Sequence, residues 1–246
     1  MDAHQLFKAG KLTEAIPALS AHLRDNPSDL RSRTFLFELL CFAGDYDRAE
    51  KQLAILQEDN KDSMLGALLY RAALAAERTR QEMFETKSFP KQHPVNGSAA
   101  SPVKGKLNGK EFQSVSDADP RIGEKLEVFA AGDYLWISYA DIASIQMEPP
   151  TKLRDLLWAP AKILTGPAFD SRELGEVLLP VISPLSFQHP DDDIRLGRAT
   201  EWCEDENGEQ SPYGLKALLV DGEEIPFLEI RLLEIDPASQ HTQASA

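Results

Sequence analysis

The chain has 246 residues and a formal net charge of −14 at pH 7, which leaves room for one large domain or two ordinary ones. Its 42% hydrophobic and 27% charged residues are typical of a globular protein, and no apolar run reaches the roughly 18–20 residues that span a bilayer. Residues 116–246 hold 25 Asp and Glu against 10 Lys and Arg, which argues against binding to nucleic-acid phosphates. We interpret this acidic half as a solvated surface, with a surface for a basic partner as the alternative.

The N-terminal residues and the two cysteines lead us to expect a cytosolic protein. The chain begins Met-Asp-Ala-His-Gln and lacks a basic start followed by an apolar stretch, so we expect no secretory signal. Cys41 and Cys203 are the two cysteines, and they match no metal-binding spacing, which indicates reduced thiols in a cytosol. Cys41 falls among apolar residues of a predicted helix, where a core thiol is expected.

The first 80 residues contain a repeat with a period of 34 residues. Four pairs of residues share this offset: Gly10 and Gly44, Leu12 and Tyr46, Ala15 and Ala49, and Leu19 and Leu53. This is the period of tetratricopeptide repeats. The glycines can end a helix and permit a tight turn, and the small alanines let two antiparallel helices approach closely.

The repeat predicts five helices in a helical domain at residues 1–87. They cover residues 2–9, 12–25, 30–43, 46–58 and 63–80. Two repeats and a longer capping helix form a short array, and such stacks usually leave a concave groove that binds a peptide or a helix. The alternative is that the array only supports the second domain, because a fold alone assigns no function.

Residues 88–103 differ in composition from the helices before them. Phe89-Pro90, His93-Pro94 and Ser101-Pro102 do not favour a regular element, and we expect an exposed linker here. Asn108-Gly109 then predicts a turn or hairpin.

Residues 104–236 favour strands, because β-branched and aromatic residues recur with a period of two. The predicted strands cover residues 126–129, 134–139, 142–147, 161–164, 176–181, 197–203, 215–220 and 225–233. Asp221-Gly222 predicts a hairpin between the last two, and residues 153–158 predict one helical turn. The predicted fold class is therefore α+β, an N-terminal tetratricopeptide-like helical array followed by a mainly antiparallel β-rich domain, either a barrel or a bent sheet. Residues 237–246 are expected to form a disordered tail.

The polar residues match no catalytic motif. A nucleophile elbow, a phosphate loop and a dinucleotide fingerprint are all missing from the sequence, so we expect no cofactor. No two of the five histidines have metal-ligand spacing. His189 precedes Asp191-Asp192-Asp193, which we interpret as a solvated acidic turn, because a cation site needs more oxygen ligands at set positions.

Five charged residues could form one cluster. They are Asp117, Asp119, Arg121, Arg154 and Asp155. Carboxylates in such a cluster can serve acid–base chemistry, but without a nucleophile, metal or cofactor motif we favour structural ion pairs. Trp136 and Trp158 are ambiguous in the same way, since a large aromatic residue can fill a core or anchor an interface.

Several runs in the second half are recognisable together. They are Asp-Ala-Asp-Pro-Arg at residues 117–121, Gly-Asp-Tyr-Leu-Trp-Ile at 132–137, Leu-Arg-Asp-Leu-Leu-Trp at 153–158, Gly-Glu-Val-Leu-Leu-Pro at 175–180 and Leu-Gly-Arg-Ala-Thr-Glu-Trp at 196–202. In this order they resemble the ImpE family, also called TagJ or SciE-type proteins. The resemblance spans roughly residues 1–235, since the family also begins with tetratricopeptide-like helices.

The resemblance implies a non-enzymatic accessory protein of a bacterial type VI secretion system, located in the cytoplasm. Family members bind the small sheath subunit through the N-terminal helix of that subunit, and they are thought to influence how the disassembly ATPase handles the sheath. Two alternatives stay open. One is a general tetratricopeptide scaffold that binds another component, such as the ATPase. The other is an enzyme that uses Asp117, Asp119 and Asp155.

The partner-binding surface has two candidate locations in the sequence. One is a groove of the helical array, near Phe35, Leu39 and Tyr70. The other is the aromatic region of the β-rich half, with Trp136, Arg154 and Trp158. No motif of the family defines a binding signature, so the sequence leaves both locations open.

Overall fold

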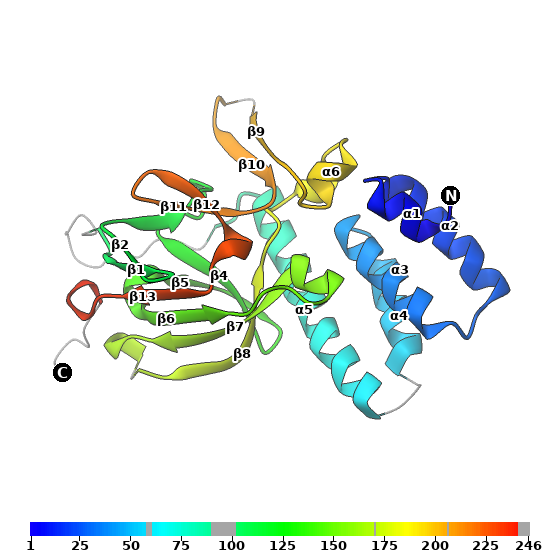
Figure 1. The fold of residues 1–246 in the computed structure, drawn as a ribbon, viewed down its shortest axis with the longest axis horizontal. Helices are drawn as coiled ribbons and strands as arrows, with labels where there is room; N and C mark the ends of the chain where they lie inside the picture. The colour runs from blue at the N-terminus through cyan, green and yellow to red at the C-terminus, as the bar shows by residue number, and fades with distance from the viewer. Residues whose placement is uncertain (58–60, 90–101, 170, 206, 241–246) are drawn as a thin grey trace.

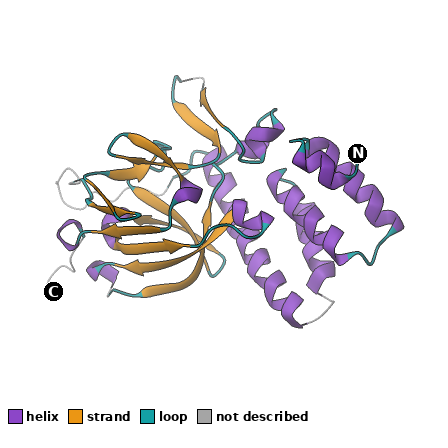
Figure 2. Cartoon of the chain, in the orientation of Figure 1, coloured by secondary structure: helices purple, strands orange, loops and turns teal. Residues whose placement is uncertain are grey.

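The computed structural model describes residues 1–57, 61–89, 102–169, 171–205 and 207–240. Its first part is helical: α1 (Ala3–Lys8), α2 (Leu12–Asp25), α3 (Leu30–Phe42), α4 (Tyr46–Gln57) and α5 (Lys61–Glu85). The strands all follow these helices, and α5 lies between the other helices and the sheet (Figure 1). The predicted α+β class, with the helical array first, is confirmed (Figure 2).

Side-chain caps and glycines mark several of the helix ends. Asp2 caps α1 in a capping box with Gln5, and the Asp29 side chain accepts a hydrogen bond from the Ser32 amide at the start of α3. Gly10 and Gly44 follow α1 and α3 with φ of +74° and +71°, a conformation that favours glycine. The predicted bounds agree to within a few residues, except that α5 runs five residues past the predicted end at residue 80.

The strands form three antiparallel sheets. They are β1 (Gly105–Leu107), β2 (Lys110–Phe112), β3 (Val115–Asp117), β4 (Lys125–Ala130), β5 (Asp133–Ser138), β6 (Ile142–Met147), β7 (Trp158–Thr165), β8 (Glu173–Pro180), β9 (Thr200–Glu204), β10 (Gln210–Gly214), β11 (Ala217–Val220), β12 (Glu223–Pro226) and β13 (Leu232–Ile235). The largest sheet has the order β2-β1-β13-β6-β7-β8-β4-β5, and β12-β11-β3 form the second. Among the described strands, β2 and β5 at the two ends of this order each pair on one side only, so the large sheet is open. Of the two predicted alternatives, a barrel or a bent sheet, the barrel does not apply to it.

Hydrophobic packing joins the sheets to each other and to the helices. One buried cluster holds residues of the large sheet together with Val115, Leu218 and Phe227 of the smaller sheet and the turn that follows it. A second cluster holds the interior of the helical array together with Phe129 and Trp158 of the large sheet. The two halves therefore share a core. The β9–β10 hairpin is the third sheet and projects from this body (Figure 1).

Some predicted elements differ from the structure. The strand expected at residues 225–233 is interrupted by the 3-10 turn Phe227–Glu229, so β12 and β13 belong to different sheets. Pro226 has no amide to donate, and the bond from the Phe227 amide to the Lys216 carbonyl is the last one in the β11–β12 register. The chain then turns, because the Ile230 amide donates back to the Phe227 carbonyl. The strands β3 and β10 were not expected. The helical turn expected at residues 153–158 is Leu153–Leu156, and Trp158 begins β7.

The linker and the tail are described only in part. Residues 90–101 of the predicted linker and 241–246 of the predicted tail lie outside the described residues. The first tail residues are not disordered: Pro237–Ser239 forms a 3-10 turn, and the Ser239 hydroxyl accepts a hydrogen bond from the Lys104 amide. The domain boundaries at 1–87, 88–103 and 104–236 stay a prediction. Among the described helices, none is both long and apolar enough to span a membrane.

Candidate partner-binding site

A buried chain of charges, which we call the α5 contact, joins the last helix to the sheet. Arg80 of α5 is 1% exposed, and its Nε and Nη2 atoms donate to Oε1 and Oε2 of Glu127 on β4 at 2.7 and 3.0 Å. Its Nη1 atom donates to Glu77, one turn earlier on α5, at 3.0 Å. Because the pair is bidentate and fully buried, it holds α5 in one orientation on the sheet.

The chain continues from Glu127 into the smaller sheet. Lys216 donates to Glu127 and lies 2.7 Å from Asp117 of β3. Burial opposes the charge on Glu127, but Arg80 and Lys216 outweigh it and lower the pKa of Glu127 to about 2. At Asp117 burial prevails over Lys216 and raises the pKa to about 6. The α5 contact is thus a set of mutually satisfied buried groups, which is a structural arrangement.

The predicted cluster of five charges divides into two places. The Asp119 carboxylate accepts hydrogen bonds from the amide and the guanidinium of Arg121, the shortest at 2.6 Å from Nη2, and the Asp119 amide donates to Asp117. Asp155 lies elsewhere, where it accepts from the Thr151 and Lys152 amides at 2.8 Å and fixes the turn before β7. The expectation of one cluster that includes Asp155 is wrong, because these carboxylates serve two separate turns.

The two candidate locations for partner binding meet at the junction of the halves. The rings of Tyr70 on α5 and Trp158 on β7 lie 6.3 Å apart, and the Arg154 guanidinium lies 4.5 Å from the centre of the Tyr70 ring. Arg154 also approaches Glu38 of α3 at 3.7 Å. Burial, which outweighs Arg154, raises the pKa of Glu38 to about 7.

Three of the six nominated residues are core residues in the structure. Phe35, Leu39 and Trp158 are all buried, and the Trp158 Nε1 atom donates to Glu77 at 2.7 Å. Side chains this deeply buried offer a partner little surface, so the structure gives no support to these three residues as partner contacts. The aromatic pattern selected them because core and interface both favour large apolar side chains.

Trp136 lies apart from this junction. It packs on Phe84 near the end of α5 and stacks on Phe89, with ring centres 6.1 and 6.0 Å away. The Lys125 ammonium covers the ring at 5.1 Å from its centre. Trp136 is only half-buried, but its ring is occupied by contacts within the chain, so its packing role is the one that the structure displays.

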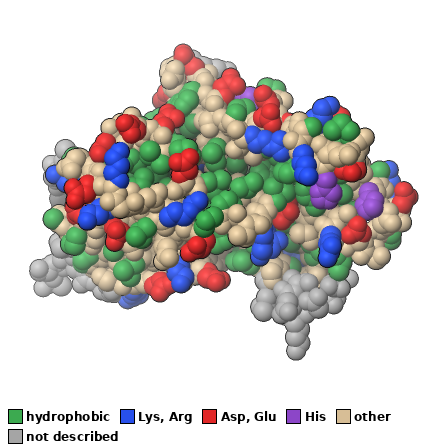
Figure 3. Space-filling view, in the orientation of Figure 1, with side chains coloured by type: hydrophobic (Ala, Val, Ile, Leu, Met, Phe, Trp, Pro, Cys, Tyr) green, Lys and Arg blue, Asp and Glu red, His purple; other side chains and the backbone are tan. Residues whose placement is uncertain are grey.

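An apolar groove opens beside Tyr70. It has a volume of about 360 Å³, and its lining comes from Leu69 and Tyr70 of α5, Gln146, residues 148–151, Asp155, residues 159–162 and 176–178, and Leu228. Leu69 is 41% exposed. Hydrophobic side chains also gather over the junction of the two halves on the face shown in Figure 3. A concave apolar surface with few charges is the usual form of a binding site, so we take this groove as the candidate site.

Sequence reasoning missed this groove, apart from Tyr70. The wall of the groove comes from α5 and its floor from strands β6 to β8, whose lining residues follow Leu69 and Tyr70 by about a hundred residues along the chain. The sequence of each floor segment predicts only an ordinary strand. The one local signal was Pro149-Pro150, which ends β6 and shapes the rim. Leu69 follows Leu68 within an apolar stretch of α5, and the pattern does not show which of the two faces the sheet.

Residues 182–198 cover the turns of the helical array, and we call this the turn-edge contact. A Cβ atom on Gly44 would lie 2.3 Å from Phe187, and one on Gly10 would lie 2.4 Å from the Asp193 carboxylate. The Arg198 side chain donates to the Phe7 carbonyl at 2.6 Å. The array therefore packs against the β-rich half at this edge.

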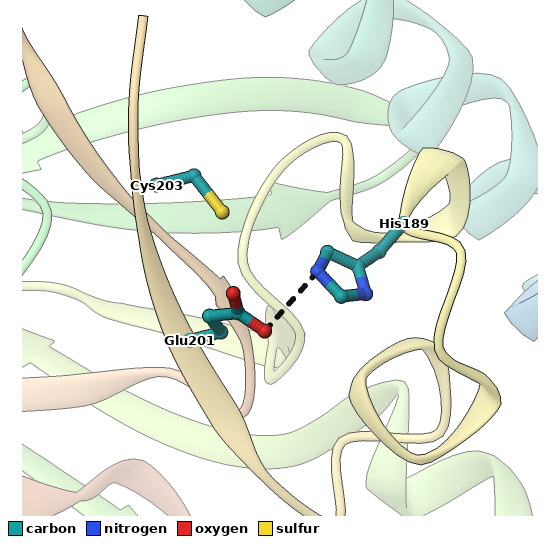
Figure 4. Close-up of side chains that lie close together, drawn as sticks. All are labelled: His189, Glu201 and Cys203. Atoms are coloured by element: carbon teal, nitrogen blue, oxygen red, sulfur yellow. Dashed lines mark ion pairs between the residues drawn. The ribbon is translucent and has the colours of Figure 1, made fainter.

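His189, Glu201 and Cys203 come within reach of one metal ion, since their ligand atoms lie within 4.8 Å of one another (Figure 4). The His189 Nδ1 atom accepts a hydrogen bond from the Asp191 amide at 3.1 Å, so in the neutral ring Nε2 carries the proton. That proton faces Glu201, 3.5 Å away. A metal ion needs the lone pair of Nε2, so this geometry fits a polar contact between the Nε2 proton and the Glu201 carboxylate better than a metal site.

The sequence was compared with models of known protein families, and two of them match. Residues 109–234 match the model of the ImpE protein family. The chain belongs to the ImpE family. Residues 6–77 match a tetratricopeptide-repeat model, which confirms the interpretation of the 34-residue period.

Two relatives extend along nearly the full chain. The type VI secretion system accessory component TagJ of Pseudomonas aeruginosa is 29% identical over 266 residues, an alignment that covers 96% of this chain and 92% of TagJ. A crystal structure of a Vibrio parahaemolyticus protein superposes with a TM-score of 0.81 at 22% identity, covering 95% of this chain and 97% of that one. That likeness shows a shared fold. In this ImpE protein the strand residues that form the floor of the groove lie within residues 109–234, which match the ImpE model. The α5 residues that form its wall, Leu69 and Tyr70, lie within residues 6–77, which match the tetratricopeptide model.

Proposed function

We propose that this ImpE protein is a non-enzymatic accessory protein of a bacterial type VI secretion system. In this proposal it works in the cytoplasm, binds the N-terminal helix of the small sheath subunit, and modulates assembly or disassembly of the sheath. The observation that carries the proposal is the similarity to the accessory component TagJ along 96% of the chain, which includes both the helical array and the β-rich half.

The site chemistry supports a binding role. The carboxylates that an enzyme hypothesis needs are engaged in pairing or capping: Asp117 with Lys216, Asp119 with Arg121, and Asp155 with backbone amides. The accessible concave surface is apolar and lies between α5 and the sheet. Such a surface can bury the apolar face of a helix, which is the element that the proposal assigns to the partner.

Calorimetry with the full-length protein tests the proposal. A peptide of the small sheath subunit's N-terminal helix is titrated into the folded chain, and a peptide of the same composition with scrambled order serves as the control. We expect binding of the native peptide at micromolar concentration or tighter, and no heat from the scrambled one. An absence of binding to the native peptide would sink the proposal.

The alternative function is a general scaffold whose partner is the disassembly ATPase. Crosslinking in cells separates it from the first proposal, because the crosslinked partner is identified by mass spectrometry. Recovery of the small sheath subunit supports sheath binding. Recovery of the ATPase without the sheath subunit favours the scaffold.

A further inference from the structure

We infer that the groove between α5 and the strands β6 to β8 receives the apolar face of an amphipathic helix that carries a Lys or Arg beside its apolar anchors. This inference rests on the proposed function for the identity of the partner. It adds the place of contact, the secondary structure of the occupant and the charge that the occupant must bring.

The floor of the groove is made of interior strands. β7 pairs with β6 on one side and with β8 on the other, while β6 also pairs with β13 and β8 with β4. The central strand of the floor, β7, is therefore paired along both edges, and Pro160 within it has no amide. An added strand would find no backbone partners on β7. An α-helix satisfies its own backbone groups, so a helix can bind with its side chains alone.

The size of the groove suits side chains from one face of a helix. An α-helix with its side chains is about 10–12 Å wide, so a volume of about 360 Å³ accepts a few apolar side chains and leaves the rest of the helix above the rim. The lining contains small or flat residues, Ala159, Pro160 and Ala161, together with Leu69 and Tyr70. Leu69 is 41% exposed, which leaves apolar area that an occupant can cover.

The charged residues at the rim of the groove indicate which charge the bound helix should carry. Lys162 stands opposite Glu176 in the β7–β8 register, and Asp155 is engaged by backbone amides. Glu148 lines the groove and is exposed, and no ion pair of Glu148 occurs among the described residues. The rim thus offers a carboxylate to a cation, in keeping with the acidic character of residues 116–246. A basic residue next to the apolar anchors would meet Glu148.

Two neighbouring leucines make a matched pair for the test. Leu69 lines the groove, whereas Leu68 does not, although the two are exposed to similar extents, 41% and 47%. Full-length wild type, Leu69→Glu and Leu68→Glu are compared by fluorescence anisotropy with a labelled peptide of the small sheath subunit's N-terminal helix. We expect Leu69→Glu to weaken binding by roughly tenfold or more, as for an anchor contact, and Leu68→Glu to change it by less than about twofold.

The outcomes separate this inference from the proposed function. If wild type binds and both variants bind equally well, the groove is the wrong place and the proposed function stands. If both variants lose binding equally, the exposed face of α5 is the contact and the groove inference fails. If wild type does not bind the peptide, the proposed function fails, and this inference, which depends on it, fails too. Leu69→Ala, a milder change at the same position, replaces Leu69→Glu if the latter lowers the melting temperature.

The rim charge has its own test. Glu148→Lys should slow association of the peptide several-fold at low salt, and the difference should fade as salt is raised, because rim charges act chiefly on the association rate. Glu223→Lys, on β12 and outside the groove lining, is the control for the change in net charge. Equal slowing in both variants would overturn the role of Glu148.

Discussion

Two of the contacts between the helices and the β-rich half differ in chemistry. The α5 contact buries full charges, with Arg80 between Glu77 and Glu127. The turn-edge contact uses apolar packing of Phe187 and hydrogen bonds near the surface, such as that of Asp192 with Thr13. A buried charge that loses its partner is costly, whereas an exposed hydrogen bond exchanges readily with water. We expect the first contact to hold the two halves together and the second to adjust their angle.

Removing the charge of Arg80 should have the largest effect. Arg80→Met leaves Glu77 and Glu127 without their shared cation in a dry site, and we expect a loss of about 3–5 kcal/mol in the free energy of unfolding. Arg78→Met is the matched control two residues away. Its pairs with Asp47 and Glu50 are exposed, so its loss should be about 0–1 kcal/mol. Chemical denaturation of both variants measures the difference, and equal losses would contradict the idea that the buried charges of the α5 contact stabilise the fold more than exposed ion pairs do.

Gly44→Ala should have the next largest effect. The left-handed conformation costs an alanine about 1–2 kcal/mol, and the overlap with Phe187 adds about 1–3 kcal/mol, so we expect a loss of about 2–5 kcal/mol. Phe187→Ala removes the two closest ring atoms and keeps only the Cβ atom, 3.0 Å away, so in that background Gly44→Ala should cost little more than the conformational part. A cost that is unchanged in that background would show that Phe187 does not rest on this turn.

Glu38 should make stability depend on pH near neutrality. Its pKa is raised to about 7 by burial, against an ordinary value of 4.5, so the folded chain keeps a proton that the unfolded chain releases. Stability therefore falls as pH rises from about 4.5 to about 7, since the unfolded state binds fewer protons in this range. We expect wild type to lose about 1 kcal/mol more than Glu38→Gln between pH 6 and pH 8.

The choice of that pH range isolates Glu38. Asp117, with a pKa of about 6, contributes the same sign mainly below pH 6. Glu127, with a pKa lowered to about 2, contributes stability that is lost only as the pH falls toward 2. Urea denaturation at pH 6, 7 and 8 is the measurement. Parallel curves for wild type and Glu38→Gln would show that Glu38 is already ionised in the folded protein.

Asp192→Asn should have the smallest effect. The Asp192 carboxylate accepts hydrogen bonds from the amide and the hydroxyl of Thr13, and α2 has no side-chain cap of its own at Lys11. Asn caps a helix nearly as well as Asp, so we expect a loss of about 0.5 kcal/mol or less, and about 1 kcal/mol for Asp192→Ala. Thermal unfolding of the two variants tests this order, and an equal loss would mean that the cap contributes nothing.

The helical half could be predicted from the sequence because its signals are local. The offset between Gly10 and Gly44 defines the period, and with it the bounds of α2 were predicted to the residue. The hairpin at Asp221-Gly222 was predicted for the same reason, since β11 and β12 pair around these two residues. Strand β10 was missed, because Pro212 lies within it and no apolar alternation marks it.

The candidate site could be predicted only in fragments. Tyr70 and Arg154 were selected and do meet, but no pattern shows that a helix residue and a turn residue 84 positions later are neighbours. Glu127 alternates with Leu126 and Val128 and so reads as solvent-facing, yet all three are buried. The second layer that covers Glu127 is α5, and only the tertiary structure brings it there.

The match between residues 182–198 and the two repeat turns has a consequence for the number of repeats. Phe187 and Asp193 meet Gly44 and Gly10, two positions that are one repeat apart. Open repeat arrays gain or lose units readily, because each unit contacts only its neighbours. In this protein, a third repeat inserted between the two would move either the Gly10 turn away from Asp193 or the Gly44 turn away from Phe187. The copy number of the repeat is thereby tied to the β-rich half, and the array cannot be lengthened as an independent module.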